Sequence, residues 1–464
     1  MAIYPNSSAS APTFLILHST PPDSTLPAFL VSTNRGFLPR NDPITVLPPP
    51  FQALEDLLQR MPIKTADGSP GLLATGSLGE AVKSLPDLTE EIERVTDDLP
   101  LMNALYRDYS FLTSAYLLEP CHMSSLRGEG YGLARDLLPA NIARPIARVA
   151  ELAGFKPFME YAGSYALYNF RLEDPVKGLE YSNLRLIRAF ENGLDPASSE
   201  AGFVLVHVDM VANSGPLVAG VEQTLAAAAA KDRDTFDEGM TAVVTALKRV
   251  NAVMNGMWSH SKPKDYTSFR TFIFGIAGQS MFPHGVIYEV VSKKPMTFRG
   301  ESGANDSMIP LMDNLLSIPM PSTPLTAILH DFRAYRPGNH REFLEWVAAR
   351  SASVDVYGFA MQDSRSAALY LRAVDQVRDF RWRHWCFTRE YILKRTAHPT
   401  ATGGSPIVTW LPNQLQAVLD LMNTVAARFE HLPGCDDIMD VAKIQQHTLR
   451  KEVEKYCQER NVEV

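Results

Sequence analysis

The stretch 364–395 constrains the fold of this chain more than any other part of it. A buried helical face is indicated by apolar side chains that recur at steps of three and four residues, namely Leu369, Ala373, Val377, Phe380, Phe387 and Tyr391. The stretch is long enough for roughly eight or nine helical turns. A buried helix of this length needs other elements packed around it, so the stretch predicts the centre of a large core.

His384 lies in the middle of this apolar stripe. Two arginines, Arg381 and Arg383, precede it, and Trp382 and Trp385 flank it. The residues alone leave two interpretations open. In the first, His384 is a core histidine whose ring bonds a backbone carbonyl. In the second, it is an axial ligand to haem iron, with the aromatic side chains against the macrocycle and an arginine at a propionate.

Composition excludes several classes of function. The 464 residues carry a formal net charge of −8 with an isoelectric point near 5.8, and no basic patch is visible, which argues against a nucleic-acid partner. The four cysteines form no CxxC pair, so we expect a reducing compartment. The apolar run 14–17 follows no basic residue and is too short to span a membrane. We therefore expect a cytoplasmic protein without a nucleic-acid or membrane partner.

The rest of the chain predicts an all-α fold, because no alternating strand pattern of useful length is present. We expect a smaller, mostly helical N-terminal domain over residues 1–155 that caps a large helical domain over residues 156–464. Residues 1–50 are rich in Pro, Ser and Thr and predict a loosely structured lead-in. The pair Asp195-Pro196 predicts the start of a helix. Apolar periodicity predicts further helices at 51–62, 78–95, 100–118, 236–257, 411–429 and 436–464.

The sequence HWCFTREYILKR, which begins at His384, and the sequence ATGGSP, which begins at residue 401, resemble the C-terminal region of the indoleamine 2,3-dioxygenase family, in particular its fungal-type members. In that family the histidine that ligates haem iron lies seven residues before a Tyr-Ile pair, as His384 lies before Tyr391. Matching segments begin near Leu138, where two prolines in residues 139–145 predict a connector into the large domain. The resemblance implies haem b as cofactor, O2 as co-substrate and His384 as the metal ligand.

An ion pair beside the haem is also implied by the resemblance. Asp313 lies eleven residues past Ser302, where family members carry an aspartate that pairs with the arginine three residues before the haem-binding histidine. That arginine is Arg381 here. The pair is expected to hold Arg381 at a haem propionate, and a generic ion pair elsewhere is the alternative.

Phe203 and His207 are the candidates for contact with the substrate ring. His207 occurs among Val, Met and Phe side chains and by itself also fits a satisfied core histidine. In the resemblance, Phe203 matches the aromatic residue that stacks on the indole, and His207 matches the position nearest the indole nitrogen. A neutral imidazole can accept the indole N–H hydrogen bond. We therefore expect His207 to orient the substrate and not to act as an essential base.

Arg270 is the candidate ligand of a carboxylate. It is surrounded in the sequence by aromatic residues, and burial of a guanidinium without an anion is unfavourable. An internal salt bridge is the alternative. In the family, an arginine five residues before a glycine binds the amino-acid carboxylate, as Arg270 precedes Gly275. Tyr266 then falls where an aromatic residue lines the same pocket.

Two loops complete the candidate site. Ser302, in the sequence FRGESGA, matches the serine of a loop beside the haem and its oxygen, and we group it with His207 as a candidate catalytic residue. Glu301 replaces a family glycine there, which could change how the substrate ammonium is held. Thr402 matches a residue of a loop that closes over the pocket and contacts the substrate.

A third segment, 161–170, is similar to the family helix that lines the distal haem pocket. Tyr161 and Ser164 are its candidate substrate contacts. The register is open by one residue, so Tyr165 can take the place of Ser164.

The activity that the resemblance implies is a haem-dependent dioxygenation. L-Tryptophan would be opened at its indole ring to N-formylkynurenine, the first step of tryptophan catabolism through kynurenine. We expect a monomer that takes a small-molecule substrate and an external one-electron reductant. Two alternatives stay open: an indole oxygenase of secondary metabolism, which takes another indole or inserts one oxygen atom, and a non-catalytic haem protein that senses or stores a ligand. Arg270 argues against the latter, which has no use for a carboxylate ligand.

Overall fold

A computed structural model describes residues 16–19, 22–192, 195–320, 324–396, 400–403 and 407–460. Helices dominate this part of the chain, and the expected all-α fold is confirmed. Four very short strands form two pairs. The strand β1 (Leu137–Leu138) lies parallel to β4 (Ile287–Tyr288), and β2 (Phe170–Leu172) lies antiparallel to β3 (Leu184–Leu186).

The helices follow one another with short connections. Those of the N-terminal part are η1 (Pro49–Phe51), α1 (Gln52–Arg60), α2 (Leu72–Thr75), α3 (Leu78–Val82), α4 (Thr89–Glu93), α5 (Leu99–Leu126), α6 (Ala140–Ala153), η2 (Tyr161–Tyr165) and η3 (Tyr181–Asn183). Those that follow are α7 (Ser199–Ala212), α8 (Ser214–Ala230), α9 (Arg233–Asn255), α10 (Met257–His260), α11 (Tyr266–Arg270), η4 (Thr271–Ile273), η5 (Gly303–Asn305), α12 (Met308–Leu315), α13 (Pro324–Arg333), α14 (Gly338–Val354), α15 (Val356–Ala360), α16 (Ser364–Phe387), η6 (Thr388–Leu393), α17 (Ile407–Ala426) and α18 (Asp436–Arg460).

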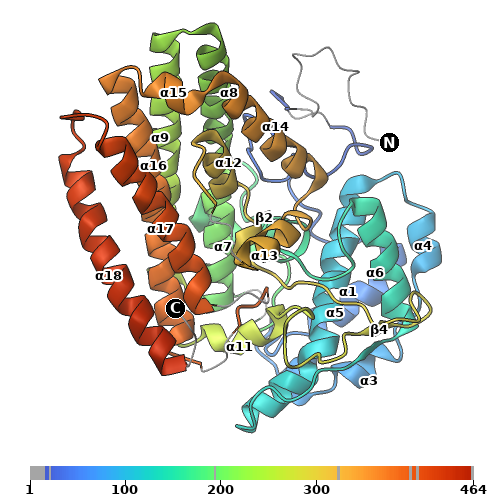
Figure 1. Ribbon diagram of the computed structural model, residues 1–464. Coiled ribbons are helices and arrows are strands. Elements are labelled where there is room, and N and C mark those ends of the chain that lie inside the picture. The colour runs from blue at the N-terminus through green and yellow to red at the C-terminus, as the bar shows by residue number, and fades with distance from the viewer. Residues whose placement is uncertain are drawn as a thin grey trace.

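Helix α5 is the centre of the N-terminal part. The side chain of Asp98 accepts a hydrogen bond from the backbone N–H of Leu101 at 3.0 Å, which satisfies one of the free N–H groups of the first turn. Most residues of α5 are buried on every side of the helix. This all-round burial is possible because α1, α3 and α6 surround α5 (Figure 1).

The C-terminal part is built on long helices that lie side by side. Helix α9 packs against α8 and α16, and α17 packs between α16 and α18 (Figure 1). The stripe that the sequence predicts for 364–395 therefore lies at the centre of this part. Helix α9 turns one apolar face into the same core, through Phe236, Met240, Val243, Leu247 and Val250.

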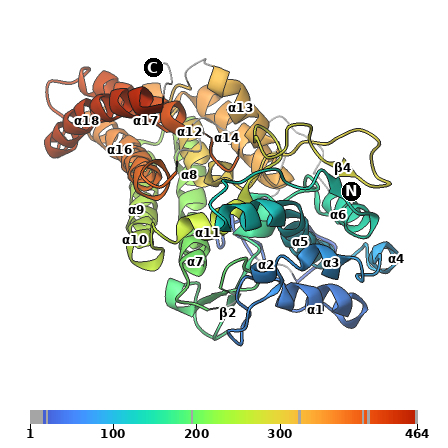
Figure 2. The same ribbon diagram turned by 90° about the horizontal axis from the view of Figure 1, so that it is seen from below.

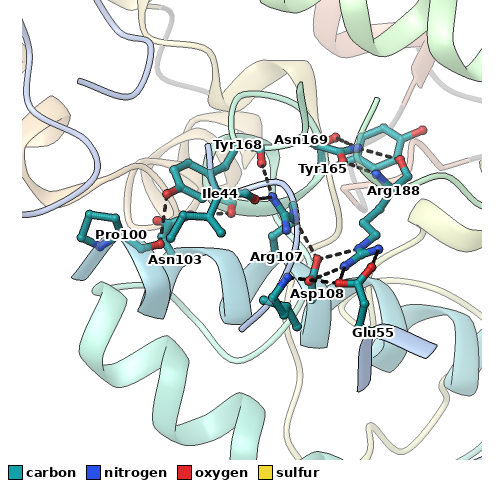
Figure 3. A network of polar contacts seen from close by, with 12 residues as sticks. Ile44, Glu55, Pro100, Asn103, Arg107, Asp108, Tyr165, Tyr168, Asn169 and Arg188 are labelled. Atoms are coloured by element: carbon teal, nitrogen blue, oxygen red, sulfur yellow. Dashed lines mark hydrogen bonds and ion pairs between the residues drawn. The ribbon is translucent and has the colours of Figure 1, made fainter. Parts of the chain in front are cut away.

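A buried network of charges links three segments of the N-terminal part. The guanidinium of Arg188, which follows β3, lies 2.6 Å from Glu55 of α1 and 2.8 Å from Asp108 of α5 (Figure 3). Burial alone raises the pKa of Asp108, but the charges of Arg107 and Arg188 outweigh it and lower that pKa to about 2. Asp108 is therefore ionised at neutral pH, although it is buried.

Two sequence predictions about helix boundaries are wrong. Helix α7 does not start at Asp195-Pro196, because the side chain of Ser198 caps it by accepting a hydrogen bond from Ala201 N at 3.1 Å. Residues 139–145 are not a connector but the first half of α6. Burial of the apolar face of α6 outweighs the one backbone hydrogen bond that Pro145 cannot donate.

Two other segments are less helical than predicted. The helix predicted at 78–95 is broken into α3 and α4, with Pro86 in the break, where its ring prevents a continuous helix. In the segment 161–170 only Tyr161–Tyr165 is helical, as a π-helical turn, and the chain then enters β2.

The lead-in is irregular, but its described residues are packed. Val31 and Phe37 are fully buried, and their backbone N–H groups donate to Asn339 Oδ1 at 2.6 Å and to Ser214 Oγ at 3.0 Å. Gly36 has a positive φ of 58°, and a Cβ there would lie 1.9 Å from Ser214 Oγ. The segment before residue 50 thus contacts α8 and α14 of the C-terminal part. The division of the chain into two domains at residue 155 stays a prediction.

One apolar stretch of the described residues passes the length and composition test for a membrane span. It is Ser199–Ala230, which comprises α7 and α8, and 67% of the tested window is buried inside the protein. A buried core helix passes the same test.

Candidate functional site

A cavity of about 350 Å³ lies where α7, α9, α11 and α16 meet the loops 301–306 and 401–402. Figure 2 shows α11, which carries Tyr266 of the cavity wall, between α7 and α5. The wall of the cavity is mostly apolar and aromatic, with Phe203, Met210, Met254, Met257, Phe380, Phe387, Tyr391 and Leu411. This composition suits a large, flat, apolar ligand.

His384 faces this cavity from the last full turn of α16. The helix starts at Ser364, where the side chain of Asp363 accepts hydrogen bonds from Arg365 N and Ser366 N, and its stripe carries His384 to the wall. Immediately after α16 the chain continues as a π-helical turn, η6, a feature that is frequent at functional sites. No hydrogen bond to the ring of His384 occurs among the described residues, so the core-histidine interpretation has no partner to support it.

The electrostatic surroundings keep His384 uncharged. Burial, followed by the proximity of His207 and of the Arg381 charge, lowers the pKa of His384 to about 4. A neutral imidazole with a free ring nitrogen is the form that ligates a metal. No group of three or more His, Cys, Asp or Glu side chains with metal-site geometry occurs in the part of the chain that the structure describes, so His384 suits a metal whose other ligands come from a macrocycle.

His207 lies on the wall of the same cavity, on α7. Its Nδ1 donates to the backbone oxygen of Phe203 at 2.8 Å, which leaves Nε2 as the acceptor. Nε2 lies toward the loop at Gly303, where a Cβ would be 3.7 Å away. Burial lowers the pKa of His207, so the imidazole is neutral. Its ring centroid lies 4.9 Å from that of Phe203 and 5.8 Å from that of Tyr161.

The ion pair expected between Asp313 and Arg381 is present. Arg381 Nη2 lies 2.7 Å and 2.9 Å from the two carboxylate oxygens of Asp313, and Nη1 donates to Gln414 O at 3.2 Å. Both charged residues line the cavity. Arg381 is thus held one helical turn before His384 on the same wall.

Three further arginines line the cavity, and the sequence interpretation missed them: Arg333, Arg336 and Arg341. Arg336 is buried and donates to the backbone oxygens of Ala304 and Asn305. The close spacing of these three arginines in the sequence is the feature that could have indicated a shared anion-binding role. Four arginines, one neutral histidine and an apolar wall fit a planar macrocycle with two carboxylates, so the residues present fit haem.

Three loops meet at the polar side of the cavity. A Cβ at Gly275 would lie 2.0 Å from Gly300 N, so both positions need glycine for the backbones to approach. Gly275 N donates to Thr402 O at 2.9 Å, and Thr402 Oγ1 donates to Glu301 O at 2.7 Å. Ser302 lines the cavity at the start of η5, where its Oγ accepts from Ala304 N.

Glu301 is buried in this loop with only 3% of its surface exposed, and it lines the cavity. Burial raises the pKa of its carboxyl to about 8. No hydrogen bond or ion pair to this carboxyl occurs among the described residues. The departure from the family pattern thus places an acid in the cavity wall.

Arg270 lies behind the wall of the cavity and not on it. Its Nη2 donates to Thr400 O at 3.0 Å, one residue before the cavity residue Ala401, and its guanidinium lies 4.6 Å from the centre of the Phe274 ring. Among the described residues its Nε and Nη1 have no hydrogen-bond partner, and the side chain is fully buried. No described carboxylate forms a salt bridge with Arg270. The internal salt bridge that the sequence left open is therefore absent among the described residues.

Neither residue of the open register lines the cavity. Ser164 Oγ donates to the backbone oxygen of Glu160 at 2.7 Å within η2, and the ring of Tyr165 packs against Phe111 and Phe190. Tyr161 is buried beside His207, and its hydroxyl has no described partner.

The cavity brings together eight of the residues predicted from the sequence, namely Phe203, His207, Tyr266, Ser302, Asp313, Arg381, His384 and Thr402.

Fold and cavity together define a class: an all-helical protein with an apolar cavity whose residues fit a haem-type cofactor. Comparison with known proteins narrows this class to a family. The family model described as indoleamine 2,3-dioxygenase matches residues 25–422. The chain belongs to the indoleamine 2,3-dioxygenase family and is therefore a dioxygenase, an oxidoreductase that uses O2 and haem.

Individual relatives are similar at low identity. Indoleamine 2,3-dioxygenase 1 of Rattus norvegicus is 26% identical over 64% of this chain and 70% of its own length. Indoleamine 2,3-dioxygenase of Saccharomyces cerevisiae is 24% identical over 84% of each chain. A protein named myoglobin, from Haliotis diversicolor, is 28% identical over 67% of this chain and 80% of its own.

Proposed function

We propose that the protein opens the indole ring of L-tryptophan with O2 and yields N-formylkynurenine. The observation that carries the proposal is that two neutral histidines, His384 and His207, face one apolar cavity, each with a ring nitrogen free of any described protein partner. The free ring nitrogen of His384 suits the cofactor, and the free ring nitrogen of His207 suits the substrate.

Bound haem supplies the iron chemistry that activates O2 for addition across the indole C2–C3 bond. His384 holds the iron through its free ring nitrogen. Arg381, fixed by Asp313, binds one propionate of the macrocycle. The apolar side chains around His384 exclude water from the reaction.

Phe203 and Tyr266, which pack against each other on the cavity wall, offer an aromatic surface against which the indole packs. His207 Nε2 accepts the indole N–H hydrogen bond, because its Nδ1 is already committed to the Phe203 carbonyl. This bond orients the ring without removing its proton. Ser302 and Thr402 keep the polar loops in place beside it.

Arg270 binds the substrate carboxylate in this proposal. Its two unpartnered guanidinium nitrogens offer the donors that a carboxylate accepts. Its Nη2 donates to Thr400 O, one residue before the cavity residue Ala401, so a shift of this segment would open Arg270 to the substrate. We further propose a cytoplasmic monomer that receives electrons from an external one-electron reductant.

The test is incubation of the reduced, haem-loaded protein with L-tryptophan and O2, followed by mass analysis of the product. Gain of two oxygen atoms supports the proposal. Gain of one oxygen atom, or turnover of an indole other than L-tryptophan only, identifies an indole oxygenase with a different product or substrate.

A second candidate is favoured by the similarity to the protein named myoglobin. In that case the protein binds O2 reversibly and consumes no tryptophan. Oxygen binding measured with and without L-tryptophan separates the two, because only a dioxygenase consumes O2 in proportion to the indole present.

A further inference from the structure

Glu301 is the exception among the buried acids that surround Tyr161. Glu160 accepts hydrogen bonds from the N–H groups of Ala162 and Gly163 at the start of η2. Asp306 accepts through Oδ2 from Met308 N at 2.9 Å and from Ile309 N at 3.2 Å, and its Oδ1 has no described partner. Glu160 and Asp306 thus each bind a helix start, whereas neither carboxyl oxygen of Glu301 has a described partner, and Glu301 faces the cavity.

No described cation forms a hydrogen bond or ion pair with the Glu301 carboxyl. Arg381 is paired with Asp313, and Arg336 donates to two backbone oxygens. Arg299, two residues before Glu301, is paired with Asp331 and donates to Gly403 O. A buried carboxyl without a counter-charge is unfavourable, so the missing partner is expected from the ligand.

The position of Glu301 is fixed by its backbone. Gly300 touches Gly275 closely enough to exclude a Cβ on either residue, and the Glu301 carbonyl accepts the Thr402 hydroxyl at 2.7 Å. The loop therefore holds this side chain at the cavity instead of letting it turn to solvent. Its charge also acts on the hydroxyls of Tyr161 and Tyr266, next to the aromatic wall.

We propose that Glu301 binds the cationic amine of the substrate. The inference rests on the proposed function and names a further substrate-binding residue of the same site. In the cavity without ligand, burial favours the neutral acid; an ammonium placed beside it restores the charged form.

The test uses three haem-loaded proteins: wild type, Glu301→Gln and Glu430→Gln. Glu430 is exposed and does not line the cavity, so its variant makes the same charge change away from the site. Three compounds are titrated: L-tryptophan, tryptamine, which keeps the amine, and indole-3-propionate, which keeps only the carboxylate. Dissociation constants come from the change in haem absorption, and kcat/KM is measured in parallel.

Glu301→Gln should weaken binding of L-tryptophan and tryptamine by roughly 30-fold or more, as expected for loss of one partner of a buried charge pair. Binding of indole-3-propionate should change less than about threefold, and Glu430→Gln should leave binding of all three compounds unaffected. Equal weakening of all three compounds by Glu301→Gln, or no change for the amines, would overturn the inference.

Two further measurements keep the outcome clear. The melting temperature of Glu301→Gln should not fall below that of wild type, because no protein hydrogen bond is lost; a fall would indicate a structural role. If the glutamine variant does not retain haem, Glu301→Asp keeps the charge and should retain part of the preference for amines. If wild type binds amines through Glu301 but oxidises no indole, the proposed function fails and the inference stands.

Discussion

Arg270 offers the sharpest test of the site, because its surroundings predict a large loss of activity without a large loss of stability. The substitution Arg270→Met keeps the length of the side chain and removes the guanidinium. In the structure that group is fully buried, donates to Thr400 O at 3.0 Å and leaves Nε and Nη1 without partners.

The change in stability follows from these contacts. Removing the two buried nitrogens that have no described partner recovers about 1–3 kcal/mol for each nitrogen, or about 2–6 kcal/mol together. Losing the charged hydrogen bond to Thr400 costs about 1.5–3 kcal/mol, and losing the contact with the Phe274 ring costs about 0.5–2 kcal/mol. The free energy of unfolding of the substrate-free protein should therefore change by between about −3 and +4 kcal/mol, without a large loss.

The change in activity should be large and in one direction. Loss of one partner of a buried charge pair weakens binding by about 2–5 kcal/mol, which is roughly 30-fold to several-thousand-fold in kcat/KM for L-tryptophan. Tryptamine lacks the carboxylate, so its kcat/KM should be low in wild type and fall little further in the variant.

The assay measures steady-state rates on both substrates, together with denaturant unfolding of both proteins. The absorption spectrum of the haem-loaded variant should match that of wild type, because Arg270 does not line the cavity. Unchanged tryptophan turnover, combined with a loss of more than about 3 kcal/mol in unfolding free energy, would refute the carboxylate assignment and make Arg270 a structural residue.

Three other perturbations are expected to have distinct outcomes. His384→Ala should fold but purify with little haem; full haem occupancy with an unchanged absorption spectrum contradicts its role as the iron ligand. His207→Ser should reduce tryptophan turnover measurably without abolishing it, and a complete loss of turnover with haem retained means that His207 has a chemical role. Asp108 has a folded pKa of about 2 against an ordinary 3.8, so its stabilising effect is present above pH 3.8 and is lost as pH falls toward about 2. Unfolding midpoints of wild type and Asp108→Asn should converge over that interval, and a constant difference contradicts the assigned shift.

The helical architecture could be predicted from the sequence because helical periodicity is a local property. Side chains three and four residues apart share a face whatever the chain does elsewhere, so the stripe of residues 364–395 revealed both the core helix α16 and the placement of His384 on its buried face. The same reasoning located α9 and α18. It failed at α6 and at the start of α7, where a buried apolar face and a serine cap outweighed the proline signals.

The site depended on information of a different kind. His384, Arg381 and Phe203 were reached through spacing and resemblance, since each lies in a short segment with its own pattern. The four arginines of the cavity come from α13, α14, α16 and the loop between the first two. Their convergence is a matter of how distant helices pack, which no local pattern contains.

Tertiary structure alone decided which polar groups are left without partners. Arg270 and Glu301 are ordinary charged residues in the sequence, and only the meeting of the loops at Gly275, Gly300 and Thr402 buries them away from any described counter-charge. Burial and pairing depend on segments brought together from across the chain, whereas helix formation depends on neighbours within one turn. The sequence by itself therefore determined the helices and the face that bears His384, and the packing of those helices determined what the cavity can bind.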